Sequence, residues 1–504
     1  MRKIEIDFNK TGMFSKKFNE FISQHSEEPY FPSYSNISAV SDKINFSKKD
    51  RINLRYEVLG QYANLEINKN VKKNIDTISE ENTFTVTTGH QLNIFSGPMY
   101  IIYKIISVIK LAKELNSRYP DKNFIPVYWM ASEDHDLEEI KSFFSNGKTY
   151  TWDVGSRGAV GKINPSSLRK LIEIIPDSID IFNEAYLQSK TLAEAVRRYM
   201  NSLFGIYGLV ILDPDSKNLK KSIIDLISDD IFNNTIYKVE KSSKKKSEVF
   251  IRKINFFYLD DQVRERIESD DSQFMVKGTK IKLSKDEMRD IISLKPHKLS
   301  PNVVTRCLYQ QMVLPNVAYI GGPSEVLYWL SFKKFFEEYG EIFPVIIPRD
   351  SVLILSRKSL KTFDRYGLEI EDIFKGKNYV EKKALGILSD NNKNFSTEIS
   401  IIKEQFKFIA EKYNHFDATM SPHIIANSKK IEKILKQIEN RFIKSQKKYN
   451  KTLILKINEV FDKVFPEDIP QERKDNILSY YNSKIIDDLY HHLDPMRLKF
   501  KIMV

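Results

Sequence analysis

The sequence has one cysteine among its 504 residues, Cys307, and this scarcity limits the classes of protein to which it can belong. A single cysteine cannot form an intramolecular disulfide, so the disulfide-stapled secreted domains are excluded. A reducing cytoplasm is the expected location. We expect Cys307 to occupy a buried apolar position rather than to act as a nucleophile.

Long apolar runs are also missing. No stretch approaches the roughly 18 consecutive apolar residues that a membrane-spanning helix needs, and residues 1–7 lack the apolar core of a secretory signal. Hydrophobic residues still make up 41% of the chain, which is enough for ordinary globular cores. We therefore predict a cytoplasmic protein with no membrane partner.

Acidic residues are outnumbered, which gives a net charge of +12. Such an excess suits anionic substrates or nucleic acid. The densest basic run, residues 241–246, has no interleaved aromatic residue that could stack on a base. A solvated lysine-rich loop explains this run, and we do not expect a nucleic-acid partner.

Five apolar runs have the length of β-strands, and each ends in a polar or Gly/Pro loop. At least two of these loops lead into helices. This order is typical of an α/β fold with an open, mostly parallel sheet, in which ligands bind beyond the carboxyl ends of the strands. The runs are Phe84–Thr88, Phe124–Met130, Tyr207–Leu212, Val317–Ile320 and Phe343–Ile347.

The spacing of these runs predicts a discontinuous Rossmann-like core. The core is expected over residues 1–150, 200–230 and 300–385. Two insertions, 151–199 and 231–299, interrupt it. Residues 466–504 are expected to pack back on the core.

Residues 390–465 show a different period, with apolar residues spaced alternately by three and four. Such heptads predict two helices of an antiparallel coiled-coil hairpin, with Ser421-Pro422 as the stop and restart. The edge of an ordinary helical bundle is the alternative. The predicted seam residues are Ile399, Ile402, Phe406, Ile409, Tyr413, Phe416 and Met420, then Ile431, Leu435, Ile438, Phe442, Ser445, Tyr449 and Thr452.

The loop Gly89–Gly97 follows the first predicted strand and precedes a helix that runs to about Leu115. Backbone N–H groups at such a helix start attract a phosphate or carboxylate. Ser96 or Gly97 is the expected N-cap, with Pro98 in the first turn. The alternative is a capped connection that binds nothing. The predicted binding residues are Gly89, His90, Gln91, Asn93, Ser96 and Gly97.

Four ionisable residues, Glu133 to Asp136, follow the second predicted strand. Because charged groups are expensive to bury, we expect all four to face solvent at the strand end. His135 or a carboxylate there can act as a general acid or base or bind a substrate amine. The alternative is an acidic helix N-terminus favoured by the helix dipole. Consecutive residues seldom point at one ion, so no metal ligand is assigned.

A third candidate segment begins at Gly321-Gly322, where two glycines let a backbone approach a ligand closely. Arg349, after the next strand, is a candidate clamp for a carboxylate or phosphate. Alternatively, Glu325 only complements the helix dipole, and Tyr328 and Trp329 only pack in the hydrophobic core. The remaining candidates here are Glu325, Tyr328 and Trp329.

These residues belong to a set of motifs, in order along nearly the full chain, that resembles the bacillithiol biosynthesis cysteine-adding enzyme family (BshC). The set is specific as a whole. The motifs are Thr88-Gly89-His90-Gln91 with Phe95-Ser96-Gly97-Pro98 and Tyr103-Lys104-Ile105-Ile106; Pro126-Val127-Tyr128-Trp129 with Glu133-Asp134-His135-Asp136; Tyr207-Gly208-Leu209 with Asp213-Pro214-Asp215; Leu299-Ser300-Pro301-Asn302-Val303-Val304-Thr305-Arg306; Gly321-Gly322-Pro323 with Glu325 and Tyr328-Trp329; Pro348-Arg349; and Leu489-Tyr490 with Leu493-Asp494-Pro495.

The resemblance implies a Rossmann-like core related to class I aminoacyl-tRNA synthetases and nucleotidyltransferases. It also implies a C-terminal coiled coil that forms a homodimer. The implied reaction joins cysteine to glucosaminyl-malate as an amide in the last step of bacillithiol synthesis, with ATP as the expected co-substrate and ADP as a related nucleotide ligand. The family commonly has other residues at four positions in the proposed pocket, which are His90, Asn93, Ser96 and Ser324.

The sequence thus predicts a cysteine ligase with Asp134 and His135 as catalytic residues, near the amine of glucosaminyl-malate. A synthetase-like protein that holds tRNA through a basic coiled coil, or that transfers a nucleotidyl group, is the alternative. A coiled-coil scaffold with a degenerate core is a third class.

Overall fold

Two units make up the structure, a computed structural model that describes residues 2–23, 28–155, 158–175, 179–270, 272–386, 395–481 and 484–504. The larger unit comprises residues 14–352 and 472–501. The smaller unit comprises residues 1–13, 353–471 and 502–504. The first residues of the predicted hairpin, 390–394, lie outside the described residues.

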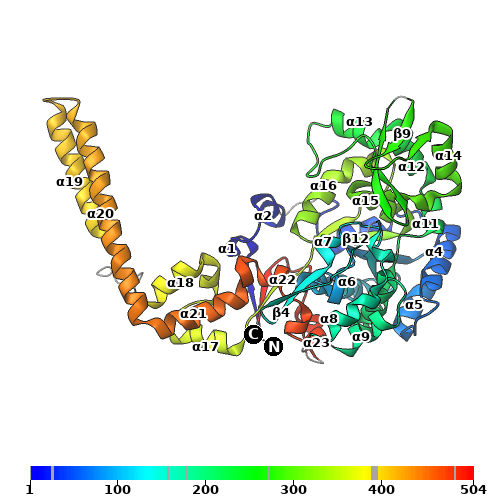
Figure 1. The fold of residues 1–504 in the computed structure, drawn as a ribbon, viewed down its shortest axis with the longest axis horizontal. Helices are drawn as coiled ribbons and strands as arrows, with labels where there is room; N and C mark the ends of the chain where they lie inside the picture. Colours follow the sequence, from blue (N-terminus) through cyan, green and yellow to red (C-terminus); the bar gives the residue numbers. More distant parts are fainter. Residues whose placement is uncertain are drawn as a thin grey trace. The chain divides into compact units, whose positions relative to one another are not determined.

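A five-stranded sheet in the order β13-β12-β2-β3-β6 forms the centre of the larger unit (Figure 1). All its strand pairings are parallel. In chain order this is the Rossmann arrangement, with the first strand in the middle. The prediction of a parallel α/β sheet is confirmed. The strands are β2 (Thr83–His90), β3 (Asn123–Met130), β6 (Val210–Leu212), β12 (Asn316–Gly321) and β13 (Val345–Pro348).

Strand β6 begins three residues later than the predicted run, which started at Tyr207. Residues Gly205–Tyr207 form a helical turn instead. Gly208 then takes a left-handed conformation with φ of 79°, which ends the turn. The first three residues of the predicted run, 207–209, therefore precede the strand and are not part of it.

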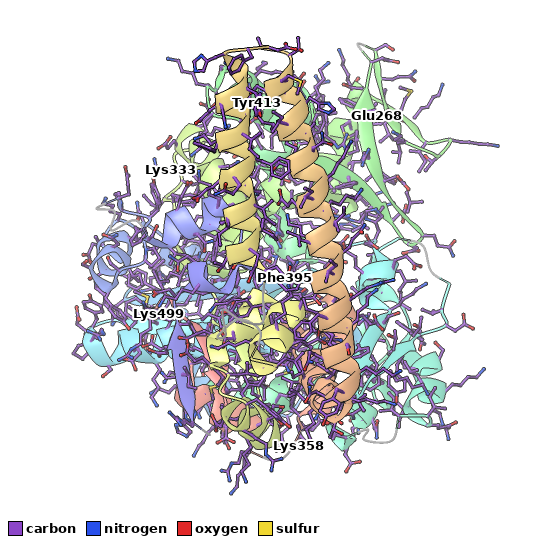
Figure 2. The ribbon with its side chains drawn as sticks, turned by 90° about the vertical axis from the view of Figure 1, so that its left-hand side faces the viewer. Glu268, Lys333, Lys358, Phe395, Tyr413 and Lys499 are labelled. Atoms are coloured by element: carbon purple, nitrogen blue, oxygen red, sulfur yellow. The ribbon has the colours of Figure 1, made fainter. Side chains whose placement is uncertain are left out.

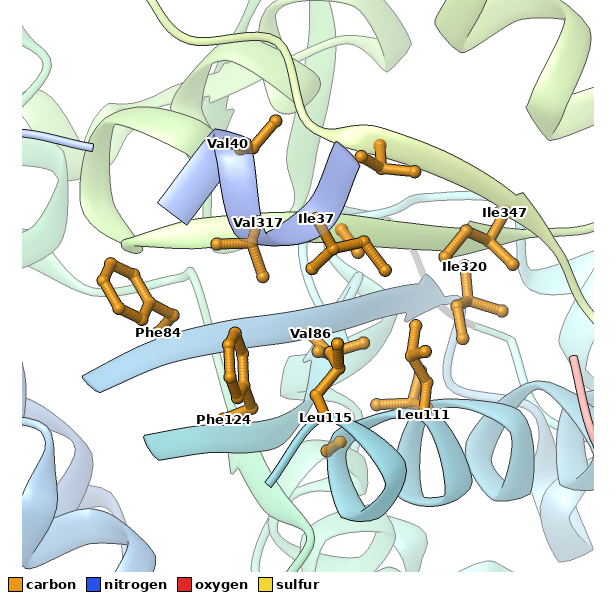
Figure 3. Close-up of a cluster of buried hydrophobic side chains, with 14 residues drawn as sticks. Ile37, Val40, Phe84, Val86, Leu111, Leu115, Phe124, Val317, Ile320 and Ile347 are labelled. Atoms are coloured by element: carbon orange, nitrogen blue, oxygen red, sulfur yellow. The ribbon is translucent and has the colours of Figure 1, made fainter. Parts of the chain in front are cut away.

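Helices cover both faces of the central sheet (Figure 3). Helix α3 (Tyr34–Ser41) brings Ile37 and Val40 to one face, and helix α6 (Met99–Arg118) brings Leu111 and Leu115 to the other. Val86 of β2 lies in the same buried cluster. Burying side chains of this kind stabilises a fold by about 1.5–3 kcal/mol each. The strand ends are thus held by a core on both sides.

The stretches between the central strands carry sheets of their own. Residues 256–301 supply a five-stranded antiparallel sheet in the order β10-β9-β8-β7-β11. A hairpin of β4 (Ser142–Ser145) and β5 (Lys148–Thr151) follows β3. The five strands are β7 (Phe256–Asp260), β8 (Val263–Ser269), β9 (Gln273–Val276), β10 (Lys282–Ser284) and β11 (Leu299–Pro301).

The larger unit contains further helices around these sheets. They are α2 (Lys16–Ser23), α4 (Lys48–Gln61), α5 (Lys69–Thr77), α7 (Leu137–Ile140), α8 (Arg169–Ile172), α9 (Asp180–Leu187), α10 (Leu192–Phe204), α11 (Lys217–Lys221), α12 (Ile224–Ser228), α13 (Thr235–Ser242), α14 (Lys285–Leu294), α15 (Val303–Val313), α16 (Pro323–Glu338) and α23 (Ile485–His492). Helix α22 (Gln471–Lys474) begins where the chain returns to this unit.

The smaller unit is mostly helical. Its described residues contribute to a sheet of order β1-β15-β14, and two of the four boundaries between the units fall within β14 and β15. No helix in the described part of the chain is long and apolar enough to cross a membrane. The elements are β1 (Lys3–Ile6), α1 (Phe8–Thr11), β14 (Ser351–Ile354), α17 (Arg357–Arg365), α18 (Lys377–Ala384), α19 (Ser396–Asn414), α20 (Met420–Tyr449), α21 (Lys451–Val464) and β15 (Phe500–Met503).

Helices α19 and α20 lie side by side as the predicted hairpin, with Tyr413 near the hairpin's free end and Phe395 near its base (Figure 2). An ion pair of 3.0 Å joins Lys403 of α19 to Glu432 of α20. The antiparallel coiled coil is therefore confirmed in its overall form.

Two details of the hairpin differ from the prediction. Helix α20 already begins at Met420, so Pro422 lies inside its first turn, where a missing N–H costs little. The predicted seam also fails at both ends of the hairpin, because Phe416 in the connection between the helices is 84% exposed and Tyr449 at the end of α20 is 89% exposed. Helix α19 is shorter than α20 and cannot cover the seam as far as Tyr449.

Candidate active site

A cavity of about 240 Å³ opens at the carboxyl ends of the central strands. It lies where the strand order reverses, between β2 and β12, which is the place where ligands bind in sheets of this kind. Its lining draws on five of the segments that the sequence singled out. The lining residues are Gly89, His90, Gln91, Trp129, Ala131, Glu133, Asp134, Pro214, Arg264, Pro301, Asn302, Val303, Arg306, Glu325 and Tyr328.

His90 ends strand β2 and is held in the cavity wall by its neighbours. Its Nε2 lies 3.0 Å from the Tyr100 hydroxyl, and its Nδ1 lies 3.2 Å from the Gln91 carbonyl oxygen. Burial, reinforced by the nearby Lys104 charge, lowers the pKa of His90 to about 3. His90 is therefore neutral at physiological pH. It can donate and accept hydrogen bonds, but it has no positive charge that would attract an anion.

Asp134 is linked to the same wall, because the Gln91 amide donates a hydrogen bond of 2.7 Å to its carboxylate. Burial alone would raise the pKa of Asp134. Hydrogen bonds from His135 and Gln91 and the charge of Arg264 outweigh burial and hold this pKa well below its usual range. Asp134 is thus an ionised carboxylate that can bind an ammonium group.

His135 lies next to Asp134 but is not among the residues that line the cavity. Its side chain is 47% exposed. Nη1 of Arg264 lies 2.7 Å from its Nδ1, and because arginine can only donate, Nδ1 is the acceptor in this contact. In this arrangement His135 can donate a hydrogen bond from Nε2.

Glu133 corrects the expectation that all four ionisable residues face solvent. It is only 5% exposed. Lys220 of α11 forms an ion pair with it, and this partner makes the burial tolerable. Burial nevertheless raises the pKa of Glu133 to about 7. Asp136 instead caps α7, accepting a 3.2 Å hydrogen bond from the Glu139 amide, as the helix-terminus alternative predicted.

Lys104 and Glu325 form a second ion pair across the point of strand reversal, in which Lys104 is buried and Glu325 is 24% exposed. The Lys104 ammonium lies 2.9 Å from both carboxylate oxygens and donates a 2.6 Å hydrogen bond to the Gly89 carbonyl. Glu325 also accepts a bond of 3.2 Å from the Gly322 amide at the start of α16. The two residues tie the end of β2 to the start of α16. Glu325 is therefore more than a complement to the helix dipole.

Ser96 and Gly97 lie in a strained loop behind the cavity rather than in its lining. Phe95, Ser96 and Gly97 all have positive φ, at 50°, 64° and 62°. A Cβ at Gly97 would come within 2.6 Å of Asn93, so only glycine fits there. The Tyr199 hydroxyl fixes this loop by donating to the Asn93 carbonyl at 2.9 Å.

The start of α6 also differs from the prediction. Pro98, not Ser96 or Gly97, is the N-cap, and it forms no side-chain cap. The first helical amide, Met99 N–H, donates to the Asp475 carbonyl at 2.8 Å. A carbonyl of the C-terminal segment therefore accepts the hydrogen bond of this amide. The sequence had predicted an anion as the acceptor.

Arg349 and Trp329 are placed away from the cavity lining. The Arg349 guanidinium forms a two-point ion pair with Glu472, at 2.8 and 3.0 Å, and both side chains are 4% exposed. Trp329 is fully buried and stacks on Tyr319. A Cβ at Gly321 would come within 2.9 Å of the Glu325 side chain, which explains this glycine. Cys307 is buried as predicted, and burial raises its pKa to about 12.

Four basic residues at or beside the cavity were not selected from the sequence. Lys104 and Arg306 lie inside the motifs of the resemblance, and their position there is the signal that could have found them. Lys220 and Arg264 carry no such signal. Arg264 comes from β8, a strand of the antiparallel sheet that lies between β6 and β12 in the sequence, and reaches the cavity through the folding of that sheet. Among the described residues no group of three or more His, Cys, Asp or Glu side chains is placed to hold a metal ion.

Comparison with known families accounts for this arrangement. The family model for the N-terminal Rossmann-like domain of bacillithiol biosynthesis BshC matches residues 1–350. The model for the C-terminal coiled-coil domain of BshC matches residues 352–504. The chain belongs to the BshC family. The resemblance inferred from the motifs is confirmed.

Curated BshC relatives match over almost their whole length. A protein of Flavobacterium johnsoniae is 36% identical, with 99% of both chains covered. One of Flavobacterium psychrophilum is also 36% identical, covering 99% of this chain and 98% of the relative. A protein of Cytophaga hutchinsonii is 32% identical over 97% of each. All three carry the name "Putative cysteine ligase BshC".

Proposed function

We propose that the chain is a cysteine ligase that adds L-cysteine to glucosaminyl-malate in the last step of bacillithiol biosynthesis. The cysteine carboxyl carbon bonds to the sugar amine as an amide. The full-length match to BshC, whose relatives are named cysteine ligases, is the observation that carries this proposal. The cavity supports this proposal, because its lining includes both an ionised carboxylate, Asp134, and a cation, Arg306.

Asp134 is the proposed binding group for the amine of glucosaminyl-malate. Its carboxylate stays ionised at neutral pH, lines the cavity and can pair with the sugar ammonium. The adjacent His135 is proposed to form a hydrogen bond with this amine and to carry its proton. The resting contact with Arg264 must open before His135 Nδ1 can accept a proton.

ATP is the proposed co-substrate. Forming an amide from a carboxylate requires that one carboxylate oxygen leave, and transfer of a phosphoryl or nucleotidyl group to that oxygen makes it a leaving group. The Rossmann-like core is compatible with a nucleotide at the strand reversal.

A homodimer through the hairpin of α19 and α20 is part of the same proposal. Ile401 and Phe408 lie one heptad apart on the outer face of α19 and are 53% and 63% exposed. An apolar stripe of this kind is typical of an association surface.

Thiol profiling tests the proposed activity. Deleting the gene should abolish bacillithiol and cause its cysteine-free precursor to accumulate, as measured by mass spectrometry of low-molecular-weight thiols. Complementation with the wild-type gene should restore the thiol. Unchanged bacillithiol in the deletion strain would rule out the proposed reaction.

The same strain tests the two residues. Genes carrying Asp134→Ala or His135→Ala should restore less than a tenth of the thiol, since each general acid–base or ion-pairing contribution is worth roughly 10²-fold or more. Asp286→Ala is the control, because this carboxylate is 90% exposed on α14. Full restoration by the Asp134 and His135 variants would remove both from the mechanism.

A further inference from the structure

Each carboxylate that lines the cavity is neutralised by a basic residue within 4.0 Å. Glu325 pairs with Lys104 and Glu133 pairs with Lys220. Asp134 lies 3.5 Å from Arg264. These three pairs leave the cavity wall electrically balanced before any ligand binds.

Arg306 is the exception in the described part of the lining. This residue of α15 lines the cavity, and the structure places no carboxylate within the ion-pair distance of its guanidinium. Nη2 of Arg306 instead donates a hydrogen bond of 2.9 Å to a neutral oxygen, the Tyr328 hydroxyl. The cavity therefore contains one positive charge in excess of its carboxylates.

Gly89 lies beside the Arg306 guanidinium in the lining of the cavity. A Cβ at Gly89 would lie 3.4 Å from Nη1 of Arg306 and 3.5 Å from the Tyr319 hydroxyl. Any larger side chain would fill the region beside Nη1. Because Gly89 and Arg306 both line the cavity, the unmatched guanidinium is open to a ligand there.

We infer that Arg306, positioned by Tyr328 and left accessible by Gly89, binds an anionic oxygen group of the substrate, namely a carboxylate of the malate moiety. This inference rests on the proposed function for the identity of the substrate. Asp134 then binds the amine and Arg306 the carboxylate, so that a glucosaminyl-malate molecule is held at both ends. The guanidinium suits this role because its planar donors match two oxygens of one carboxylate.

Calorimetric titration of the full-length protein tests the subsite with two ligands, glucosaminyl-malate and methyl glucosaminide, which lacks the malate. Arg306→Gln should weaken binding of glucosaminyl-malate roughly 10- to 100-fold, as expected for loss of hydrogen bonds to a charged group. Binding of the methyl glycoside should not change. Arg289→Gln is the matched control, since this arginine is 61% exposed on α14.

A second variant guards against loss of folding. Arg306→Lys keeps the charge but loses the planar fork, and a roughly tenfold weaker affinity is expected. Wild-type affinity for glucosaminyl-malate in both Arg306 variants would overturn the inference and leave the proposed function intact.

A titration with ATP distinguishes a subsite for the malate carboxylate from a subsite for a phosphate. If wild type binds ATP through Arg306 but does not bind glucosaminyl-malate, the subsite takes a phosphate, and the malate assignment and the proposed substrate both fail. If neither ligand depends on Arg306, the subsite itself is rejected.

Discussion

Single side chains at the cavity are held in place by pairing across long distances in the sequence. Lys104 and Glu325 are 221 residues apart and share two contacts of 2.9 Å. Removing one partner of such a buried pair leaves an uncompensated charge, which costs about 3–5 kcal/mol. The ionisable residues of the site are therefore structural supports for one another as well as candidates for binding.

His90 provides a pH test at the residue scale. Its folded pKa is about 3, whereas an unfolded histidine titrates near 6.5. The unfolded chain binds more protons between these values, so the free energy of unfolding should fall as the pH falls. Between pH 7 and pH 5 this residue should cost about 2 kcal/mol of stability.

Denaturation followed by tryptophan fluorescence can measure this, because Trp129, Trp152 and Trp329 all belong to the larger unit, as does His90. His90→Gln should lose about 2 kcal/mol less than wild type over this pH range. His491→Gln, at an exposed histidine of the same unit, should behave like wild type. Equal pH dependence in His90→Gln and wild type would contradict the neutral, buried state of His90.

At the scale of elements, the connection from β2 to α6 depends on the C-terminal segment. The buried Asn476 side chain donates to the carbonyls of Phe95 and Gly97 at 2.8 and 2.7 Å. Positive φ at the two non-glycine residues Phe95 and Ser96 is costly, and it persists only where neighbours hold the backbone. The C-terminal segment thus fixes the backbone behind the cavity wall.

Asn476→Ala should destabilise the larger unit by roughly 2 kcal/mol or more, since two buried carbonyls lose their donors. Asn70→Ala is the control, because this exposed asparagine of the same unit also donates to a main-chain carbonyl, that of Ile206, at 2.7 Å. Denaturant titration with tryptophan fluorescence compares the two. A loss in Asn476→Ala no larger than in Asn70→Ala would show that the loop holds its shape alone.

At the scale of the whole molecule, the hairpin of α19 and α20 has exposed apolar side chains among its described residues. The exposed Ile401 and Phe408 are better explained by a second copy than by solvent. The double substitution Ile401→Lys with Phe408→Lys should convert the proposed dimer to a monomer in light-scattering measurements. Leu294→Lys, at a leucine of α14 that is 63% exposed, should leave the mass unchanged. A wild-type monomer would refute the proposed dimer.

The sequence by itself determined the strands of the central sheet, their order along the chain, and the helical hairpin. Five apolar runs predicted the five parallel strands, and a heptad spacing predicted the hairpin, because both patterns are local and repeat with the period of the backbone. The motifs at the strand ends were also sufficient to identify the BshC family. The cytoplasmic location and the assigned roles of Asp134 and His135 stay predictions.

Only the tertiary structure decided which charged residues meet. Glu133 was expected in solvent, but Lys220 makes its burial possible. Arg349 was expected to bind a ligand, yet its guanidinium is occupied by Glu472, 123 residues away. Arg264 lines the cavity from strand β8 of the antiparallel sheet, and no sequence motif marks it. Ion pairs form between side chains that the fold brings within a few ångströms, and sequence periodicity carries no information about those distances.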